Sequence, residues 1–296
     1  MPRATIDEQP RTLARPGGVT LAYRRTPARR KGAKSPVLLL HGLASNLSRW
    51  SEFVERTNLA DSRDLIRVDL RGHGDSPTRG RINLELWSDD LLALLDAEGK
   101  ASALLVGHSL GAQVALACAA RAPQRVAALV LIDPVFRQAL HGKWKWLARA
   151  APLFRLAVLL VRTLNALGLR RREIERLDLR ALDQLARESL GSPQAEAEFI
   201  RRYSSTRADL RSFRTAHYLQ ELIEMFRPAA APESIAAPTL VLLSTGATFA
   251  DLAPMRAIAA RFAHSEVRTI DCHHWPLTER PDEVRRIIED WSASVD

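Results

Sequence analysis

The sequence is poor in cysteine, with only Cys118 and Cys272 among its 296 residues. Two cysteines form no disulfide framework, and neither stands at a spacing typical of metal ligands. Long uncharged apolar runs are also missing, since the most hydrophobic segment, residues 147–169, contains three arginines. The first eighteen residues have no apolar signal core. These absences predict a soluble, cytoplasmic protein.

Phosphate-binding glycine motifs are absent from the sequence, which has neither a P-loop nor a G-x-G-x-x-G sequence. We therefore expect no nucleotide, no metal and no other cofactor. The 43 basic residues exceed the 34 acidic ones, for a formal charge of +9. Such an excess is compatible with nucleic acid or an anionic membrane as partner. Because the basic residues are spread along the chain and no nucleic-acid-binding motif occurs, we favour a solvated basic surface.

Short apolar segments alternate with helical segments over much of the chain, and 46% of the residues are hydrophobic. After an expected hairpin at 11–26, strands are expected at 37–40, 65–68, 103–106, 126–132, 238–243 and 266–270. Helices are expected at 50–59, 86–96, 112–120, 253–262 and 281–291. Strands that are apolar on both faces and alternate with helices are typical of a parallel sheet covered on both sides. Residues 1–10 are expected to be disordered.

The alternation stops between residues 136 and 232, where the pattern is helical. We expect helices at 144–167, 171–190, 193–203 and 209–226. The prediction is an α/β core formed by residues 1–135 and 233–296, into which residues 136–232 are inserted as a helical cap.

The sequence Gly107-His108-Ser109-Leu110-Gly111 follows a strand-like apolar run and precedes a stretch of helix formers. Strand, tight turn and helix form the context of a G-x-S-x-G nucleophile elbow. A Cβ atom at either glycine would crowd such a turn. The Leu110 amide would lie at a helix N-terminus, where it can stabilise a developing oxyanion.

Three further motifs accompany the elbow: His41-Gly42, Asp69-x-Arg71-Gly72-His73-Gly74-x-Ser76, and His274-Trp275-Pro276. With these four motifs in this order, the chain resembles the α/β-hydrolase superfamily from about residue 11 to residue 291. The resemblance implies an α/β-hydrolase fold with a helical cap. It also implies a serine hydrolase that forms an acyl-enzyme. Serine at the elbow argues against an epoxide hydrolase or a dehalogenase, which use aspartate there.

A serine hydroxyl needs a neighbouring base to act as a nucleophile at neutral pH. The resemblance assigns this role to His274 rather than to His273, which stands where the family usually has glycine. The backbone amides of Leu43 and Leu110 would form the oxyanion hole. We expect a small-molecule ester as substrate. A lactone, a thioester, an amide or a cleavable C–C bond would require the same motifs.

The acid that would orient His274 is ambiguous. The family usually has an aspartate after the strand at 238–243, but Phe249 or Ala250 stands at that position and Asp251 follows one or two residues late. Asp133, at the end of the strand at 126–132, is the alternative, because some hydrolases of this family take their acid there. We favour Asp133 and keep Asp251 open. The irregular acid also leaves open a non-catalytic, ligand-binding member of the fold.

Gly42, His108 and Trp144 are the expected substrate contacts. In the cap, Trp146, Phe154 and the apolar stretch 156–167 could line an acyl pocket or pack into the core. Arg149, Arg155 and Arg162 would share one face of a single helix. Such a basic amphipathic helix could lie on an anionic membrane, although a solvated face is the favoured interpretation. The oligomeric state stays open.

Overall fold

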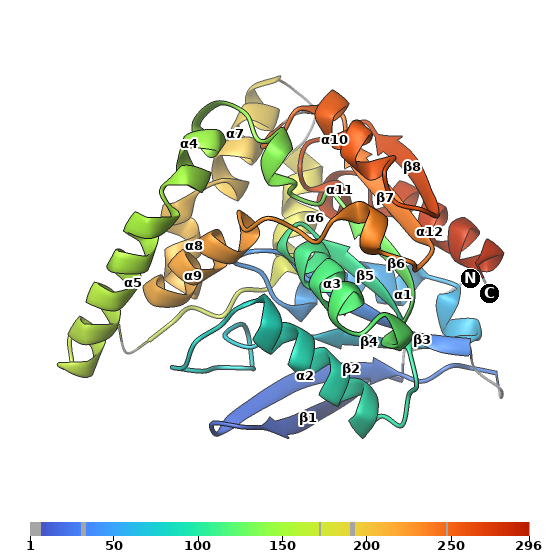
Figure 1. Ribbon diagram of the computed structural model, residues 1–296, viewed down its shortest axis with the longest axis horizontal. Helices are drawn as coiled ribbons and strands as arrows, with labels where there is room; N and C mark the ends of the chain where they lie inside the picture. The colour runs from blue at the N-terminus through green and yellow to red at the C-terminus, as the bar shows by residue number, and fades with distance from the viewer. Residues whose placement is uncertain (1–6, 31–33, 172, 190–192, 247, 296) are drawn as a thin grey trace.

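Eight strands form one sheet in the computed structural model, which describes residues 7–30, 34–171, 173–189, 193–246 and 248–295 (Figure 1). The sheet order is β1-β2-β4-β3-β5-β6-β7-β8. β1 and β2 form an antiparallel hairpin and β2 pairs antiparallel with β4, while every pairing from β4 to β8 is parallel. The strands are β1 (Gln9–Arg15), β2 (Val19–Thr26), β3 (Lys34–Leu40), β4 (Arg63–Val68), β5 (Ala103–His108), β6 (Val126–Ile132), β7 (Thr239–Ser244) and β8 (Ser265–Ile270). The predicted fold class is confirmed.

Helices cover both faces of the sheet because the central strands alternate their apolar side chains between two cores. Leu38 and Leu40 of β3 pack with α2 (Leu84–Ala97), α3 (Leu110–Arg121) and α10 (Leu252–Ala259). Val37 and Leu39 pack on the other side with α1 (Ser51–Arg56) and α12 (Pro281–Ser294). A short helix, α11 (Pro276–Glu279), precedes α12.

The edge strands differ from the prediction that every strand is apolar on both faces. β1 and β8 are largely half-buried or exposed, since each lies at an end of the sheet and has a neighbour on one side only. The expected disorder of residues 1–10 is also wrong for Gln9 and Pro10, which pair with Arg25 and Arg24 in the hairpin. Residues 1–6 lie outside the described residues.

Six α-helices occur between β6 and β7 in the part of the chain that the structure describes. They are α4 (Gly142–Arg149), α5 (Ala151–Ala166), α6 (Leu179–Ser189), α7 (Pro193–Tyr203), α8 (Thr206–Ser212) and α9 (Thr215–Met225). Figure 1 shows α4 and α5 along one side of the molecule, with α8 and α9 between α5 and the sheet. We call α4 to α9 the inserted helices. Their description as a separate cap with the boundaries 136 and 232 stays a prediction.

Three of the inserted helices begin or end elsewhere than expected, each for a local reason. The expected helix 144–167 is broken at Ala150, because Pro152 is tolerated only in the first turn of a helix. Arg149 therefore belongs to α4 and does not share a helix with Arg155 and Arg162. The helix expected from 171 begins at 179, where the Asp178 carboxylate caps its first amides, and its predicted end, Leu190, lies outside the described residues.

The last expected inserted helix, 209–226, is two helices. The Ser205 side chain accepts a hydrogen bond from the Ala208 amide and starts α8. The chain then turns at the extended, buried Phe213 before α9. None of the helices described is long and apolar enough to cross a membrane.

Candidate active site

Ser109 stands between β5 and α3 with backbone angles of φ 53° and ψ −115°. The turn is so tight that a Cβ atom at Gly107 would lie 2.3 Å from the Gly111 carbonyl oxygen. A Cβ atom at Gly111 would lie 2.3 Å from the Leu40 carbonyl oxygen. Both distances are far below van der Waals contact, so the turn requires glycine at both positions. Its conformation is that of a nucleophile elbow.

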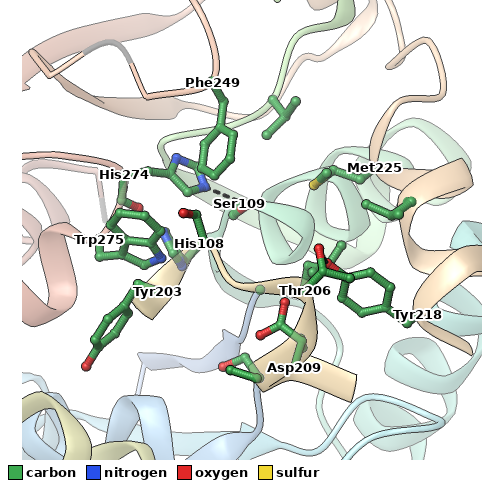
Figure 2. A pocket seen from close by; sticks show the side chains of 18 of the residues that line it. His108, Ser109, Tyr203, Thr206, Asp209, Tyr218, Met225, Phe249, His274 and Trp275 are labelled. Carbon is green, nitrogen blue, oxygen red and sulfur yellow. Dashed lines mark hydrogen bonds between the residues drawn. The ribbon is translucent and has the colours of Figure 1, made fainter. Parts of the chain in front are cut away.

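Two hydrogen bonds connect Ser109, His274 and Asp133. His274 Nε2 lies 2.9 Å from Ser109 Oγ, and His274 Nδ1 lies 2.8 Å from Asp133 Oδ2. Figure 2 shows the imidazole above the serine, with the first of these bonds dashed. The three side chains come from the ends of β5, β6 and the loop after β8, and all three are buried. The arrangement can move a proton from the hydroxyl to the imidazole.

Asp133 is held by its backbone as well as by His274. Its φ is 47°, and its Oδ1 accepts a hydrogen bond of 2.9 Å from the Ser244 amide on β7. Burial raises the pKa of Asp133, but the hydrogen bonds from His274 and Ser244 and the imidazole charge outweigh it, so the pKa is lowered. Asp251 instead lies at the N-terminus of α10 with an exposed side chain. Asp133, not Asp251, is the carboxylate in contact with His274.

Phe249 is one of the two residues, with Ala250, at which the resemblance predicts the usual acid position. Its ring meets the His274 ring edge-on, with the centroids 4.3 Å apart, and the Trp144 ring with the centroids 4.6 Å apart. An aromatic side chain there confines the imidazole without providing charge.

His108 and His273 flank His274 and have other partners. His108 Nε2 donates to the His274 carbonyl oxygen at 2.8 Å. Burial, together with the charge of His274, lowers the pKa of His108 to about 3, so this ring stays neutral. His273 Nδ1 lies 3.1 Å from the Glu279 carboxylate, and Glu279 also accepts the His273 amide. His108 thus supports the His274 backbone, while His273 is tied to α11.

The loop after β3 runs beside the elbow. A Cβ atom at Gly42 would lie 3.4 Å from Ser109 Cβ, and Leu43 borders the same cavity as Ser109. Leu110 is the first residue of α3. Within the described residues, neither the Leu43 amide nor the Leu110 amide donates to a backbone carbonyl. Both amides are therefore available as donors near the serine.

A buried carboxylate from α9 holds this loop. Glu221 Oε2 accepts a hydrogen bond of 2.9 Å from the amide of Ala44, whose φ is 47°. Glu221 Oε1 lies 3.1 Å from His73 Nε2, and both side chains are fully buried. Burial lowers the pKa of His73, but the charge and hydrogen bond of Glu221, the charge of Asp69 and the Arg71 carbonyl together outweigh it, so the pKa is raised. No sequence motif pointed to Glu221.

A cavity of about 390 Å³ opens above Ser109 and His274 between the sheet and the inserted helices. Figure 2 shows Thr206, Asp209 and Tyr218 across from His274, and Tyr203 below Trp275. Its apolar lining includes Leu43, Val135, Trp144, Leu147, Leu177, Leu179, Leu182, Leu222, Met225, Phe226, Phe249 and Trp275. The expected contacts Gly42, His108 and Trp144 all border it. Tyr203, Asp209 and Tyr218 lie in no motif, so the sequence did not point to them. Phe249 carried a signal as one of the two residues, with Ala250, expected at the usual acid position.

Other predicted pocket residues lie elsewhere. The side chain of Trp146 is exposed, and the apolar stretch 156–167 belongs to α5, no residue of which borders the cavity. Phe154 packs against the core. In the described part of the chain, no three His, Cys, Asp or Glu side chains are grouped so as to hold a metal ion.

Comparisons with known proteins show the family of the chain. A family model described as alpha/beta hydrolase fold matches residues 35–281. The chain is 40% identical over 112 residues to the dihydrolipoyllysine-residue acetyltransferase component of the acetoin cleaving system of Pseudomonas putida, covering 37% of this chain and 30% of that protein. It is 34% identical over 113 residues to esterase YbfF of Escherichia coli, covering 38% and 44% respectively. The chain thus spans less than half the length of these two relatives.

Among solved structures, a thermophilic esterase from Thermogutta terrifontis is similar over nearly the whole chain. The TM-score is 0.67 at 25% identity, and the superposition covers 97% of this chain and 99% of that one. The likeness extends through the inserted helices, which the sequence motifs do not reach.

Proposed function

Because the chain belongs to the alpha/beta hydrolase family, we propose that it is a serine hydrolase that cleaves carboxylic esters through an acyl-enzyme. One observation carries the proposal: the hydrogen-bonded chain from Ser109 through His274 to Asp133 faces a largely apolar cavity. The esterase names of several relatives support it.

In the proposed first step, Ser109 Oγ attacks the ester carbonyl carbon while His274 Nε2 accepts the hydroxyl proton. The carbonyl π electrons move onto oxygen, and the resulting oxyanion is stabilised by the amides of Leu43 and Leu110. Asp133, whose lowered pKa keeps it ionised, stabilises the imidazolium.

Collapse of this intermediate breaks the C–O bond, and the leaving alkoxide takes the proton from His274. A water molecule then attacks the acyl-Ser109 carbonyl with His274 again as the base. The carboxylic acid leaves, and the proton returns to Ser109. Lactones, thioesters and amides would also form a tetrahedral intermediate and an acyl-enzyme at Ser109. The mechanism therefore does not distinguish these substrates, and our proposal is that esters are the preferred ones.

The cavity bears on substrate size and polarity. Its walls near the serine, including Trp144, Phe249 and Trp275, are aromatic, whereas Asp209 and Arg202 lie among its polar lining. A volume of about 390 Å³ is at the small end of ligand sites. We expect short to medium acyl chains to be accepted and long chains to be excluded.

The test is hydrolysis of p-nitrophenyl esters of increasing acyl length, together with labelling by a fluorophosphonate. Wild type should turn over esters and be labelled at Ser109. Ser109→Ala should lose at least about 10⁴-fold in kcat and all labelling. Ser212→Ala, which removes another cavity hydroxyl, should change neither by more than about twofold.

Two outcomes would overturn the proposal. If wild type neither turns over esters nor reacts with the fluorophosphonate, the chain is a non-catalytic ligand-binding member of the family. If wild type is labelled but prefers thioesters, lactones or amides over matched esters, Ser109 is the nucleophile but the proposed substrate class is wrong.

A further inference from the structure

A row of leucines on α5 faces solvent. Leu153, Leu156, Leu160, Leu164 and Leu167, which directly follows the helix, are 68%, 64%, 59%, 37% and 73% exposed. Their spacing of three or four residues places them on one side of the helix. We call these five residues the leucine face. Trp146 of α4, which is 69% exposed, and Leu169 extend the exposed apolar surface beyond both ends of α5.

The opposite side of α5 is already packed. It lies against α9, and Phe154 on that side contacts the core. Figure 1 shows α5 on the outside of the molecule, with α9 between it and the sheet. The helix is therefore apolar on both sides. Monomeric proteins rarely expose a contiguous apolar patch of this kind unless it binds something.

The excess positive charge of the chain lies in the same segment. Residues 137–172 contain nine lysines and arginines and no aspartate or glutamate, while the remaining residues contain 34 basic and 34 acidic side chains. The whole net charge of +9 thus comes from the segment that contains α4 and α5. Lys145 and Arg149 on α4 and Arg155 on α5 are exposed, and the Arg149 guanidinium lies over the Trp146 ring, 5.1 Å from its centroid.

We propose that the leucine face and the basic residues around it dock this protein onto an anionic lipid bilayer. Exposed leucine and tryptophan can enter the acyl-chain boundary, while lysine and arginine meet anionic headgroups. α5 is 16 residues long and contains Arg155 and Arg162, so it would lie in the plane of the interface.

The positive charge near the leucine face distinguishes between its possible binding partners. A second copy of this chain would bring its exposed Lys145, Arg149 and Arg155 against the same residues of the first copy, and the repulsion would oppose association through this face. A nucleic acid would match the charge but would leave the leucines in water. An anionic bilayer satisfies both the apolar and the basic side chains. The inference does not depend on the proposed esterase activity.

The experiment is co-sedimentation of the full chain with large unilamellar vesicles of phosphatidylcholine alone or mixed with phosphatidylglycerol. Wild type should bind the anionic vesicles at least about tenfold more tightly than the neutral ones, and binding should weaken as salt rises. Leu156→Glu/Leu160→Glu should reduce binding about a hundredfold or more. Lys145→Glu/Arg155→Glu should reduce it at least about tenfold.

Matched controls come from exposed positions elsewhere. Leu185 on α6 is 58% exposed and the Arg268 side chain on β8 is 61% exposed. Leu185→Glu and Arg268→Glu should each bind within about threefold of wild type. Thermal unfolding checks that every variant is folded. A second readout is fluorescence quenching by brominated lipid, which should be strong in wild type and weak in Trp146→Phe.

Three results would overturn the inference: wild type that does not sediment with anionic vesicles at low salt, controls that lose binding as much as the leucine variants, or wild type that is a dimer in solution and becomes monomeric in Leu156→Glu/Leu160→Glu. The last would assign the leucine face to a second copy of the chain.

Discussion

At the scale of single residues, backbone strain is concentrated around the proposed site. Ala44, Ser109 and Asp133 are the non-glycine residues with positive φ in the described part of the chain. Such conformations cost about 1–3 kcal/mol each and persist only where the surroundings enforce them. Ser109 and Asp133 direct their side chains at His274, and Ala44 directs its amide at Glu221. Each strained residue presents a group that the proposed reaction uses or that supports the loop beside it.

Replacing Asp133 tests the third member of the hydrogen-bonded chain. Asp133→Asn should lower kcat by about 10⁴-fold, because an amide cannot stabilise the imidazolium and favours the wrong imidazole tautomer. Ester hydrolysis under saturating substrate measures the loss. Asp251→Asn, at the exposed carboxylate that the sequence left as an alternative, should stay within about twofold of wild type. The opposite ranking of the two variants would contradict the assignment.

The raised pKa of Asp209, which borders the cavity, predicts that stability depends on pH. Burial, helped by the charge of Glu221, raises its pKa to about 7, against a partial opposing effect of Tyr218. Between pH 3.8 and 7 the folded state therefore keeps a proton that the unfolded state has lost, so its contribution to stability falls as pH rises through this range.

Asp209→Asn removes that titration. The melting temperature of the variant, relative to wild type, should rise from pH 4 to pH 7 and level off above pH 7. The ratio of wild-type to variant KM for an apolar ester should rise over pH 6 to 8, as the cavity gains a negative charge. If the difference in melting temperature between Asp209→Asn and wild type does not change with pH, the raised pKa of Asp209 is contradicted.

At the scale of elements, α9 connects the inserted helices to two loops of the sheet. Glu221 reaches the loop after β3 and the loop after β4, through Ala44 and His73. His217 Nε2 lies 3.2 Å from the Gly80 carbonyl oxygen. The same helix lines the cavity with Tyr218. One helix thus sets both the wall of the cavity and the position of the loop that carries the Leu43 amide.

Removing the Glu221 carboxylate should affect stability and turnover together. Glu221→Ala leaves the Ala44 amide and the His73 ring buried without their partner, which should cost about 3–5 kcal/mol in urea unfolding. The kcat should fall by up to about 10² while KM changes little, because the Leu43 amide loses its fixed position. Glu198→Ala, at an exposed ion pair on α7, is the control and should cost under about 1 kcal/mol.

At the scale of the whole molecule, a buried polar cluster joins the inserted helices to the sheet. Arg49, in the short helix Leu47–Trp50, lies 2.5 Å from the Asp183 carboxylate on α6 and 2.7 Å from Thr278 Oγ1 on α11. The hydroxyl of Tyr203 on α7 donates to Asp183 at 2.8 Å. Arg49, Tyr203 and Thr278, which come from three different elements, thus meet at the Asp183 carboxylate of α6.

Breaking this polar cluster should weaken the packing of the inserted helices against the sheet domain. Asp183→Ala leaves the Arg49 charge buried and unpaired, so we expect a loss of about 3–5 kcal/mol and faster proteolysis within residues 136–232. The double variant Arg49→Met/Asp183→Leu should recover much of the loss, since it removes both charges. Arg180→Ala breaks an exposed ion pair to Glu55 and should cost under about 1 kcal/mol. Equal effects of the buried and exposed substitutions would contradict this reasoning.

Features that depend on short stretches of chain were predictable from the sequence. The elbow at Ser109 requires glycines two residues away on either side, and the central strands are read from continuous apolar runs. The helix breaks were harder, because Pro152 and Asp178 act over a few residues and compete with a longer helical pattern. The edge strands were misjudged because exposure depends on the position of a strand in the sheet.

The sequence by itself determined the parallel α/β sheet and the tight turn at Ser109, since apolar patterns and glycine requirements are local, and the family resemblance of its motifs pointed to His274. Only the tertiary structure decided that Asp133, rather than Asp251, faces His274, and that Glu221 holds Ala44, 177 positions away. It also decided that the α5 leucines face solvent instead of the cavity. The reason is the same in each case: the direction of a side chain depends on which distant elements pack against it, and local sequence does not contain that information.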